Sequence, residues 1–233
     1  MDQIGNGHHF AQAQDCLLCG LVARGPIPLC AACANDLPRA PQPACPRCAR
    51  PSPNGAACGA CLRAPGHVDG VRAAYRYTYP LDRLVQDYKY GHRLALADAF
   101  GTALCAIAPQ AQAIDLIVPL PLHPARLRAR GSNQALELAR PVARHLGQAL
   151  ATELLERQRD TAPQAEQPLA ARRRNVRQAF HCRRDLRGAR LLLIDDVMTS
   201  GATLDEAART LKLHGAARVD ALVLARALPP HEV

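Results

Sequence analysis

Apolar residues follow two kinds of pattern along the chain after residue 66. Short apolar or β-rich runs lie at 68–79, 115–118, 150–155, 191–197 and 219–225, and segments with helical apolar spacing lie at 81–90, 95–107, 133–145 and 202–214. The run at 191–197 reads LLLIDDV, and an apolar run that ends in acids is typical of a parallel strand buried on both faces. Strands that alternate with helices predict an α/β fold, with a mainly parallel sheet flanked by helices.

The first 65 residues contain few large apolar residues and most of the cysteines. Eight of the ten cysteines form four CxxC pairs there. Two thiolates three positions apart can hold one metal ion, and two such pairs complete the tetrahedral coordination that Zn²⁺ prefers. We therefore predict a small double zinc ribbon with two structural zinc sites, although the spacing leaves open which pairs combine. The predicted zinc ligands are Cys16, Cys19, Cys30, Cys33, Cys45, Cys48, Cys58 and Cys61.

A disulfide framework is the alternative for these cysteines, and such frameworks are typical of exported proteins. The start of the chain, MDQIGNGHHF, lacks the basic and apolar regions of an export signal. No apolar run approaches the roughly 18 to 20 residues that span a bilayer. We therefore expect a cytoplasmic protein with reduced thiols and no membrane insertion.

Six prolines lie at 38–53, around the midpoint of the cysteine block. Because proline fixes the backbone and removes a hydrogen-bond donor, this stretch is predicted to be a stiff connector that is neither helix nor strand. The cysteine spacing ends just before Pro65 and Gly66. We therefore expect two domains, a double zinc ribbon at 11–65 and an α/β domain at 66–233.

The chain is basic, with 29 Lys and Arg, 20 Asp and Glu, and a formal net charge of +9. Much of the excess lies at 157–190, where ten arginines and three acids leave a charge of +7. This charge favours an anionic partner such as nucleic acid, polyphosphate or a membrane headgroup, and the planar arginine side chain suits phosphate oxygens. A solvated surface segment is the alternative interpretation of the arginine cluster.

The segment 191–205, LLLIDDVMTSGATLD, places two carboxylates, several hydroxyls and a glycine at a strand-to-helix junction. Unpaired backbone N–H groups at the start of a helix can bind phosphate, and Gly201 permits close approach. Asp195 and Asp196 would repel that phosphate, so we expect them to bind sugar hydroxyls or hydrated Mg²⁺. The junction predicts a site for a phosphorylated sugar. The alternative interpretation of the junction is that Thr199 and Thr203 only cap the helix and that the acids face solvent.

The sequence IDDVMTSGAT resembles the phosphoribosyl pyrophosphate (PRPP) motif of type I phosphoribosyltransferases. Combined with the CxxC block, with VPLPLHPARLRARGSNQALELA at 118–139, and with the segments RDTAPQ and RRRNVRQAF, it is similar to the ComF (competence protein F) family. The resemblance covers nearly the whole chain. It implies a type I phosphoribosyltransferase-like fold that carries the double zinc ribbon at its amino-terminal end.

The resemblance also implies roles for individual residues. It places Asp195 and Asp196 at the ribose hydroxyls as the catalytic carboxylates. The implied PRPP-binding residues are Val197 and Met198, then Thr199, Ser200, Gly201, Ala202 and Thr203 around the 5′-phosphate. Pro119, Leu120, Pro121 and Leu122 are implied as a pyrophosphate loop, and Arg159 as the start of a mobile flap over 159–175. Arg130 and Lys89 are further candidate ligands, although Lys89 could equally be an exposed helix lysine.

These roles lead to an expected activity. A nucleophile displaces pyrophosphate from C1 of PRPP, with Mg²⁺ and arginines at the departing oxygens and a closed flap that excludes water. The acceptor is unknown, and no general base for a particular acceptor stands out. The resemblance links this activity to DNA uptake in natural competence. One alternative is a competence protein whose zinc ribbons and arginines bind single-stranded DNA and which uses PRPP only as a ligand. Nucleobase salvage is the other.

Overall fold

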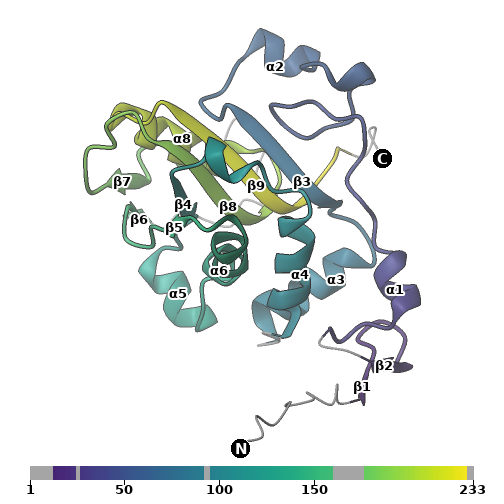
Figure 1. Ribbon diagram of the computed structural model, residues 1–233. Coiled ribbons are helices and arrows are strands. Elements are labelled where there is room, and N and C mark those ends of the chain that lie inside the picture. Colours follow the sequence, from purple (N-terminus) through teal and green to yellow (C-terminus); the bar gives the residue numbers. More distant parts are fainter. Residues whose placement is uncertain (1–12, 25–26, 92–94, 160–175, 230–233) are drawn as a thin grey trace, which may run out of the picture.

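The computed structural model describes residues 13–24, 27–91, 95–159 and 176–229 (Figure 1). The helices are α1 (Ala31–Asn35), α2 (Gly59–Arg63), α3 (Leu81–Tyr90), α4 (Ala95–Cys105), α5 (Pro124–Arg130), α6 (Gln134–Leu146) and α8 (Ala202–Leu213), with short 3₁₀ helices η1 (Pro53–Gly55) and η2 (Ala111–Ala113). The strands are β1 (Ala13–Asp15), β2 (Val22–Arg24), β3 (Gly70–Arg76), β4 (Leu116–Pro119), β5 (Ala149–Leu150), β6 (Leu155–Arg157), β7 (Phe180–Cys182), β8 (Arg190–Met198) and β9 (Arg218–Arg226). None of the helices in these ranges has both the length and the apolar character needed to cross a bilayer.

Five strands form the central sheet in the order β3-β9-β8-β4-β5, and each neighbouring pair is parallel. Successive residues of β8 belong to opposite faces, since Leu192 contributes to one apolar cluster and Leu193 to the other. Helices α3, α4 and α6 cover the first face, and α8 covers the second. The predicted α/β fold with a parallel sheet between helices is confirmed.

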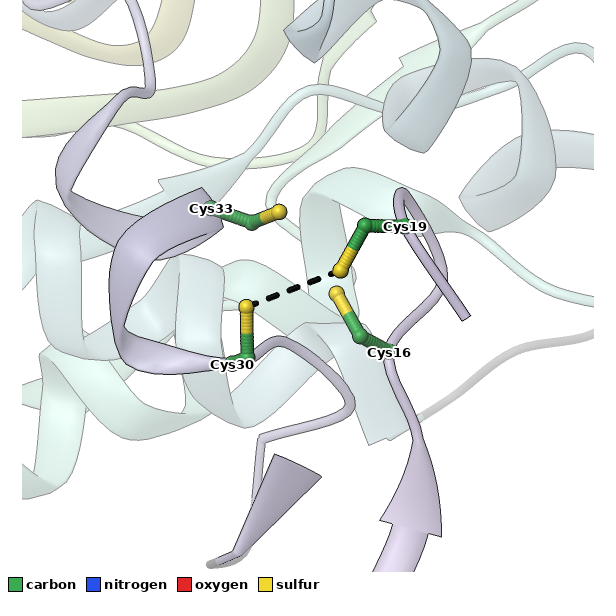
Figure 2. Close-up of side chains that lie close together, drawn as sticks. All are labelled: Cys16, Cys19, Cys30 and Cys33. Atoms are coloured by element: carbon green, nitrogen blue, oxygen red, sulfur yellow. Dashed lines mark hydrogen bonds between the residues drawn. The ribbon is translucent and has the colours of Figure 1, made fainter. Parts of the chain in front are cut away.

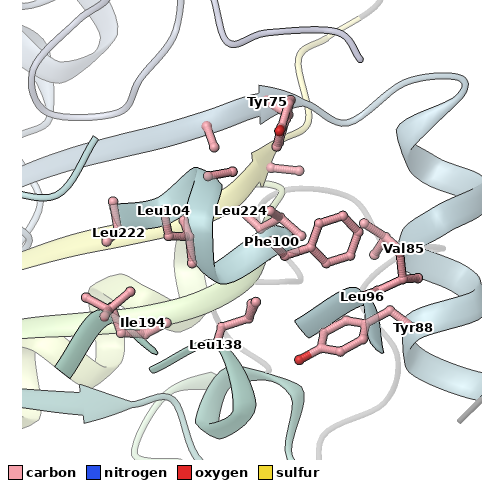
Figure 3. Close-up of a cluster of buried hydrophobic side chains, with 14 of the residues drawn as sticks. Tyr75, Val85, Tyr88, Leu96, Phe100, Leu104, Leu138, Ile194, Leu222 and Leu224 are labelled. Atoms are coloured by element: carbon pink, nitrogen blue, oxygen red, sulfur yellow. The ribbon is translucent and has the colours of Figure 1, made fainter. Parts of the chain in front are cut away.

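The larger apolar cluster joins α3, α4 and α6 to the sheet (Figure 3). The rings of Tyr88 on α3 and Phe100 on α4 pack edge to face, with their centroids 5.5 Å apart. Leu138 on α6 and Ile194 on β8 are fully buried in the same cluster. Burial of one such side chain stabilises the fold by roughly 1.5–3 kcal/mol, so this cluster fixes the helices that later supply the site.

The chain connections leave β4 and β8 in opposite directions. From β4 the chain passes through α5 and α6 to β5 at one edge of the sheet, whereas from β8 it passes through α8 to β9 on the other side. Neighbouring parallel strands whose connections diverge leave a crevice at their carboxyl ends. The sheet order therefore places a crevice beside the loop that the sequence analysis singled out.

Two parts of the α/β domain differ from the expected elements. The single strand expected at 150–155 is wrong, because β5 pairs with β4 in the main sheet while β6 pairs with β7 in a separate antiparallel ribbon. Helix α5, with Pro124 in its first turn and the His123 ring accepting a hydrogen bond from Ala125 N, was not expected. The expected flap over 159–175 lies almost wholly outside the described residues.

The proline-rich connector runs along β3, the edge strand of the sheet. Arg76 N donates to Pro38 O at 2.7 Å, Ala40 N donates to Ala74 O at 3.0 Å, and Val71 N donates to Pro46 O at 2.8 Å. Up to Pro53, where η1 begins, the connector contains no helix and only isolated bridges, as its prolines predict. Backbone hydrogen bonds therefore join the cysteine-rich part to the sheet.

Candidate functional site

The eight CxxC cysteines form two clusters of four. The first two pairs meet in one cluster, which we call the first cluster (Cys16, Cys19, Cys30 and Cys33), and the last two pairs meet in the second cluster (Cys45, Cys48, Cys58 and Cys61). Within each cluster the Sγ atoms lie within 4.8 Å of one another. Figure 2 shows the side chains of the first cluster converging, with the Cys19 and Cys30 sulfurs 3.7 Å apart. Four converging thiols fit the tetrahedral coordination of zinc, so each cluster can hold one zinc ion, as the predicted double zinc ribbon requires.

Backbone N–H groups prepare both clusters for a metal cation. Burial raises the pKa of the Cys16 thiol, but hydrogen bonds from backbone groups of Cys30, Leu18 and Cys19 outweigh it and bring the pKa to about 6. Burial likewise opposes ionisation of Cys45, and backbone donors that include Cys58 N at 3.3 Å lower its pKa to about 7. Because zinc binds the thiolate form, one thiol of each cluster is prepared for metal binding at neutral pH. By contrast, hydrogen bonding with Cys19 raises the pKa of Cys33, and burial raises the pKa of Cys61.

A cavity of about 320 Å³ lies at the carboxyl ends of β4 and β8, in the crevice that the diverging connections create. Its lining comes from the loop after β4, the loop after β8 with the start of α8, and the end of α3, together with residues of α5, the start of α6, β6 and the segment after β3. It contains Lys89, Arg126, Arg130 and Arg157 together with two carboxylates. The excess of cations suits an anionic ligand.

The two carboxylates of the cavity come from the end of β8. Asp196 is 8% exposed, and its Oδ2 lies 3.1 Å from Lys89 Nζ. Burial, and then the charge of Asp196, raises the pKa of Asp195 to about 7. Burial lowers the pKa of Lys89, but the two aspartates outweigh it and raise that pKa, so the lysine stays charged. The cavity thus holds a cation between two acids.

The loop between β8 and α8 presents free backbone donors. In the described part of the chain, the N–H groups of Thr199, Ser200 and Gly201 donate to no protein acceptor. Gly201 has φ +81°, which side chains other than glycine rarely adopt, and it precedes the first turn of α8. The loop therefore has the free donors of an anion site at a helix N-terminus.

Most of the sequence-predicted PRPP residues lie at this cavity. Its lining includes Asp195, Asp196, Val197, Met198, Thr199, Gly201 and Thr203 from the β8–α8 junction, Leu120, Pro121 and Leu122 after β4, and Lys89 and Arg130. Four of the predicted residues do not line it: Pro119, Ser200, Ala202 and Arg159.

The structure gives the position or the hydrogen bond of each of these four residues. Pro119 is the last residue of β4. Ser200 Oγ accepts from Ala202 N at 3.3 Å, so the two residues support the turn into α8. Arg159 Nη1 donates to Arg177 O at 2.8 Å, away from the cavity.

Sequence reasoning missed a group of polar side chains that also line the cavity. The group includes Tyr77 after β3, Gln86 and Tyr90 on α3, and Arg157 on β6. Arg130 lies over the Tyr90 ring, 5.3 Å from its centroid. Gln86, Lys89 and Tyr90 have the spacing of one helix face, a signal that could have extended the Lys89 prediction to its neighbours.

Comparisons with known proteins match both parts of the chain. Residues 132–230 match the phosphoribosyl transferase domain, and residues 10–62 match the double zinc ribbon domain. The crystal structure of TT1426 from Thermus thermophilus aligns with a TM-score of 0.32 at 17% identity, covering 59% of this chain and 84% of that one. That likeness is too remote to inform the site.

Two bacterial relatives cover most of the chain. The DNA utilization protein YhgH of Salmonella typhimurium is 33% identical over 219 residues, which cover 91% of this chain and 90% of the relative. Competence protein F of Haemophilus influenzae is 28% identical over 179 residues, which cover 73% of this chain and 78% of the relative. With a double zinc ribbon joined to a phosphoribosyltransferase-like domain, the chain belongs to the ComF (competence protein F) family.

Proposed function

We propose that this chain binds PRPP with Mg²⁺ in the cavity and transfers its phosphoribosyl group to an acceptor, releasing pyrophosphate. The observation that carries the proposal is the loop after β8, where free backbone donors stand directly beside two carboxylates. A phosphorylated sugar matches both features, because its phosphate accepts hydrogen bonds from the backbone donors and its hydroxyls donate hydrogen bonds to the carboxylates. The proposal assigns the transfer site to residues 66–233 and a structural role to the zinc ribbon at 11–65.

The 5′-phosphate occupies the loop from Val197 to Thr203 in this proposal. The N–H groups of Thr199, Ser200 and Gly201 donate to its oxygens, and the positive end of α8 favours its charge. The hydroxyls of Thr199 and Thr203 line the same cavity and add donors. Ser200 and Ala202 support the turn behind them.

Asp195 and Asp196 accept hydrogen bonds from the ribose hydroxyls and so orient the sugar ring. Backbone hydrogen bonds hold both carboxylates in place: Asp196 N donates to Asp195 Oδ1 at 2.9 Å, and Val197 N donates to Asp196 Oδ1 at 2.6 Å. Carboxylate oxygens are also the ligands that Mg²⁺ prefers, so these two residues suit a hydrated ion. Bound Mg²⁺ would neutralise negative charge on the pyrophosphate.

Transfer breaks the bond between C1 and the pyrophosphate oxygen while a bond from the acceptor to C1 forms, and the electron pair leaves with pyrophosphate. Arg130 and Lys89 line the cavity and can hold the departing oxygens. Lys89 has three donors, of which the ion pair with Asp196 uses one. In the loop of Pro119, Leu120, Pro121 and Leu122, only Leu122 offers a backbone N–H to the leaving group, because proline has none and Leu120 N donates to Ile194 O at 2.9 Å. Arg159, which bonds to Arg177 O, would have to move to reach the cavity.

The proposal predicts that Asp196→Asn weakens PRPP binding while Asp115→Asn does not. Asp196 lies in the cavity, whereas Asp115 pairs with Arg190 at the opposite end of β4 and β8. Losing a charged hydrogen-bond acceptor costs about 1.5–3 kcal/mol, which is roughly tenfold or more in affinity. Calorimetric titration with PRPP and Mg²⁺ measures both variants, and a pyrophosphate-release assay with candidate bases and DNA then searches for the acceptor. Absence of heat with the unaltered chain would refute the proposal.

A second candidate function is binding of single-stranded DNA with PRPP as a ligand only. Relatives named for DNA utilization and competence, the net charge of +9 and the exposed rings of Tyr79 and Tyr90 support it. DNA held by arginines should lose affinity steeply with added salt, whereas PRPP held by backbone donors should be less sensitive. This second function is favoured if Asp196→Asn leaves DNA affinity intact and if PRPP releases no pyrophosphate with any of the candidate acceptors.

A further inference from the structure

Arg226, the last residue of β9, connects the second cysteine cluster to the loop after β8. Its side chain is 1% exposed, which is unusual for an arginine. Its Nε donates to Cys48 O at 2.8 Å. Its Nη1 donates to Met198 O at 2.9 Å and also to Thr199 O. One guanidinium group therefore contacts a cysteine of the second cluster at one end and the candidate phosphate loop at the other.

The contacts of Arg226 help to fix the direction of the N–H groups in that loop, together with Ala227 N, which donates to Met198 O at 3.0 Å. In a planar peptide, the C=O of one residue and the N–H of the next point in opposite directions. Met198 O shares its peptide with Thr199 N, and Thr199 O shares its peptide with Ser200 N. A donor that holds both carbonyls on one side therefore turns the N–H groups of Thr199 and Ser200 to the other side, where they donate to no protein acceptor among the described residues.

The second cluster in turn holds Arg226. Cys48 provides both a sulfur to the cluster and the carbonyl that receives Arg226 Nε. A zinc ion with four thiolates carries a net charge of −2, which offsets the cost of burying the guanidinium cation beside it. Without zinc, this negative charge and the constraint on the Cys48 carbonyl are lost.

A second contact ties the end of the ribbon to the same region. Backbone N of His67, just past the second cluster, donates to Asp205 Oδ1 in the first turn of α8. A Cβ added at Gly66 would lie 2.4 Å from the same carboxylate oxygen, so the linker packs directly on the helix. The loop from Met198 to Gly201 thus lies between two attachments of the zinc ribbon.

We infer that Arg226 is a positioning residue through which zinc in the second cluster orders the phosphate loop, so that zinc at this cluster and PRPP bind cooperatively. The inference rests on the proposed function for its ligand. Zinc in the first cluster has no such connection in the described part of the chain, because no residue of that cluster contacts Arg226 or the loop through a hydrogen bond given by the structure. The two clusters should therefore respond differently to PRPP.

The test measures the zinc affinity of each cluster with and without PRPP and Mg²⁺. Competition with a chromogenic chelator follows both zinc ions, and the variants Cys19→Ser and Cys61→Ser assign them to the first and second clusters. Coupling between sites changes affinity by about 5- to 150-fold in typical proteins, so we expect PRPP to tighten zinc in the second cluster by roughly tenfold and to leave the first unchanged. Equal effects on both clusters, or none, would overturn the inference.

Arg226→Lys is the decisive variant. Lysine keeps the buried charge on a single nitrogen, whereas Arg226 uses Nε for Cys48 and Nη1 for the loop. We therefore expect both zinc ions to remain, PRPP affinity to fall by roughly tenfold, and the effect of PRPP on zinc affinity to disappear. Arg218→Lys is the matched control, because Arg218 begins the same strand and pairs with Asp220 near the surface. Arg226→Met, which keeps most of the volume, replaces the lysine variant if that variant does not fold.

A measurement without PRPP separates this inference from the proposed function. The amide resonances of Thr199 and Ser200 should shift in Cys61→Ser but not in Cys19→Ser, and the Cys61→Ser shift should be absent when Arg226 is also replaced by lysine. If this pattern holds and PRPP gives no heat, the proposed function fails while the coupling stands. If PRPP binds but neither the resonances nor the zinc affinities depend on Arg226, the coupling fails while the proposed function stands.

Discussion

The two cysteine clusters have the same four ligands but are attached to the α/β domain in different ways. The first cluster is attached by apolar packing, since Cys16, Leu29 and Leu37 belong to the buried group that includes Leu81 and Leu84 of α3. In Figure 1, α1 accordingly lies beside α3. The second cluster is attached by hydrogen bonds, through Pro46 O and Cys48 O to the sheet strands, and its apolar contribution is the small side chain of Ala49.

This difference shows that similar metal sites in one chain can have different structural effects. Apolar contacts are non-directional, so the first cluster contributes stability to the face covered by α3 without fixing a particular peptide group. Hydrogen bonds are directional, so the second cluster fixes the Cys48 carbonyl and, through Arg226, the peptides after β8. The consequence of losing each zinc ion should differ accordingly.

Loss of a buried ligand should have the largest effect. Metal analysis should find two zinc ions per chain, and Cys45→Ser, at a position that is 0% exposed, should reduce this to one and lower the melting temperature sharply. The reason is that structural zinc contributes on the order of 10 kcal/mol to the folding of small zinc domains. Cys19→Ser, at an exposed position, should lose its zinc with a smaller change in melting temperature. If the two variants lower the melting temperature equally, the proposed difference in attachment between the two clusters is wrong.

Apolar truncation should have an intermediate effect, confined to the attachment of the first cluster. Leu29 is 6% exposed and precedes Cys30, so Leu29→Ala should lower the free energy of unfolding by about 2–3 kcal/mol. Leu21 in the same part of the chain is 67% exposed, and Leu21→Ala should change the free energy of unfolding by less than about 0.5 kcal/mol. Urea denaturation of the zinc-loaded protein measures both. Similar values for the two variants would mean that the first cluster is not anchored by packing.

The smallest effect is expected at the polar contact between the linker and α8. Asp205→Asn weakens the acceptor for His67 N and removes a negative charge from the helix start, and both groups are partly exposed, so the cost should be at most about 1 kcal/mol. Asp98→Asn is the matched control, since Asp98 also lies in the first turn of a helix, α4. Denaturation curves compare the two variants. If Asp205→Asn lowers the free energy of unfolding by much more than Asp98→Asn does, the linker is attached to α8 more strongly than this partly exposed hydrogen bond explains.

Local sequence was sufficient to predict the parts of the site that consist of neighbouring residues. The CxxC spacing predicts the zinc ligands, and the order of acids, hydroxyls and glycine predicts the junction of β8 and α8, because both features lie within a few positions of one another. The combination of the four pairs into two clusters was left open because the intervals between the pairs are nearly equal. The roles of individual PRPP residues remain predictions.

Contacts between distant segments were not accessible to the same reasoning. In the sequence, Arg226 is simply a residue at the end of an apolar strand. Its contacts with both the second cluster and the loop depend on the register that places it beside Met198 in β8. The ion pair of Lys89 with Asp196 depends in the same way on how α3 packs against the sheet. Charge and spacing identify such residues as candidates, but only strand order and helix packing determine their partners.

The connector along β3 has a consequence for how the α/β domain could be produced alone. An uncovered outer strand offers a row of unpaired backbone groups that can recruit a strand from another molecule and start aggregation. Here the stretch around Pro38 and Ala40 occupies that side of β3, and proline cannot donate to an incoming strand. Truncation at residue 66 would expose this side, so we expect a protein without the ribbon to self-associate even where its own core can form.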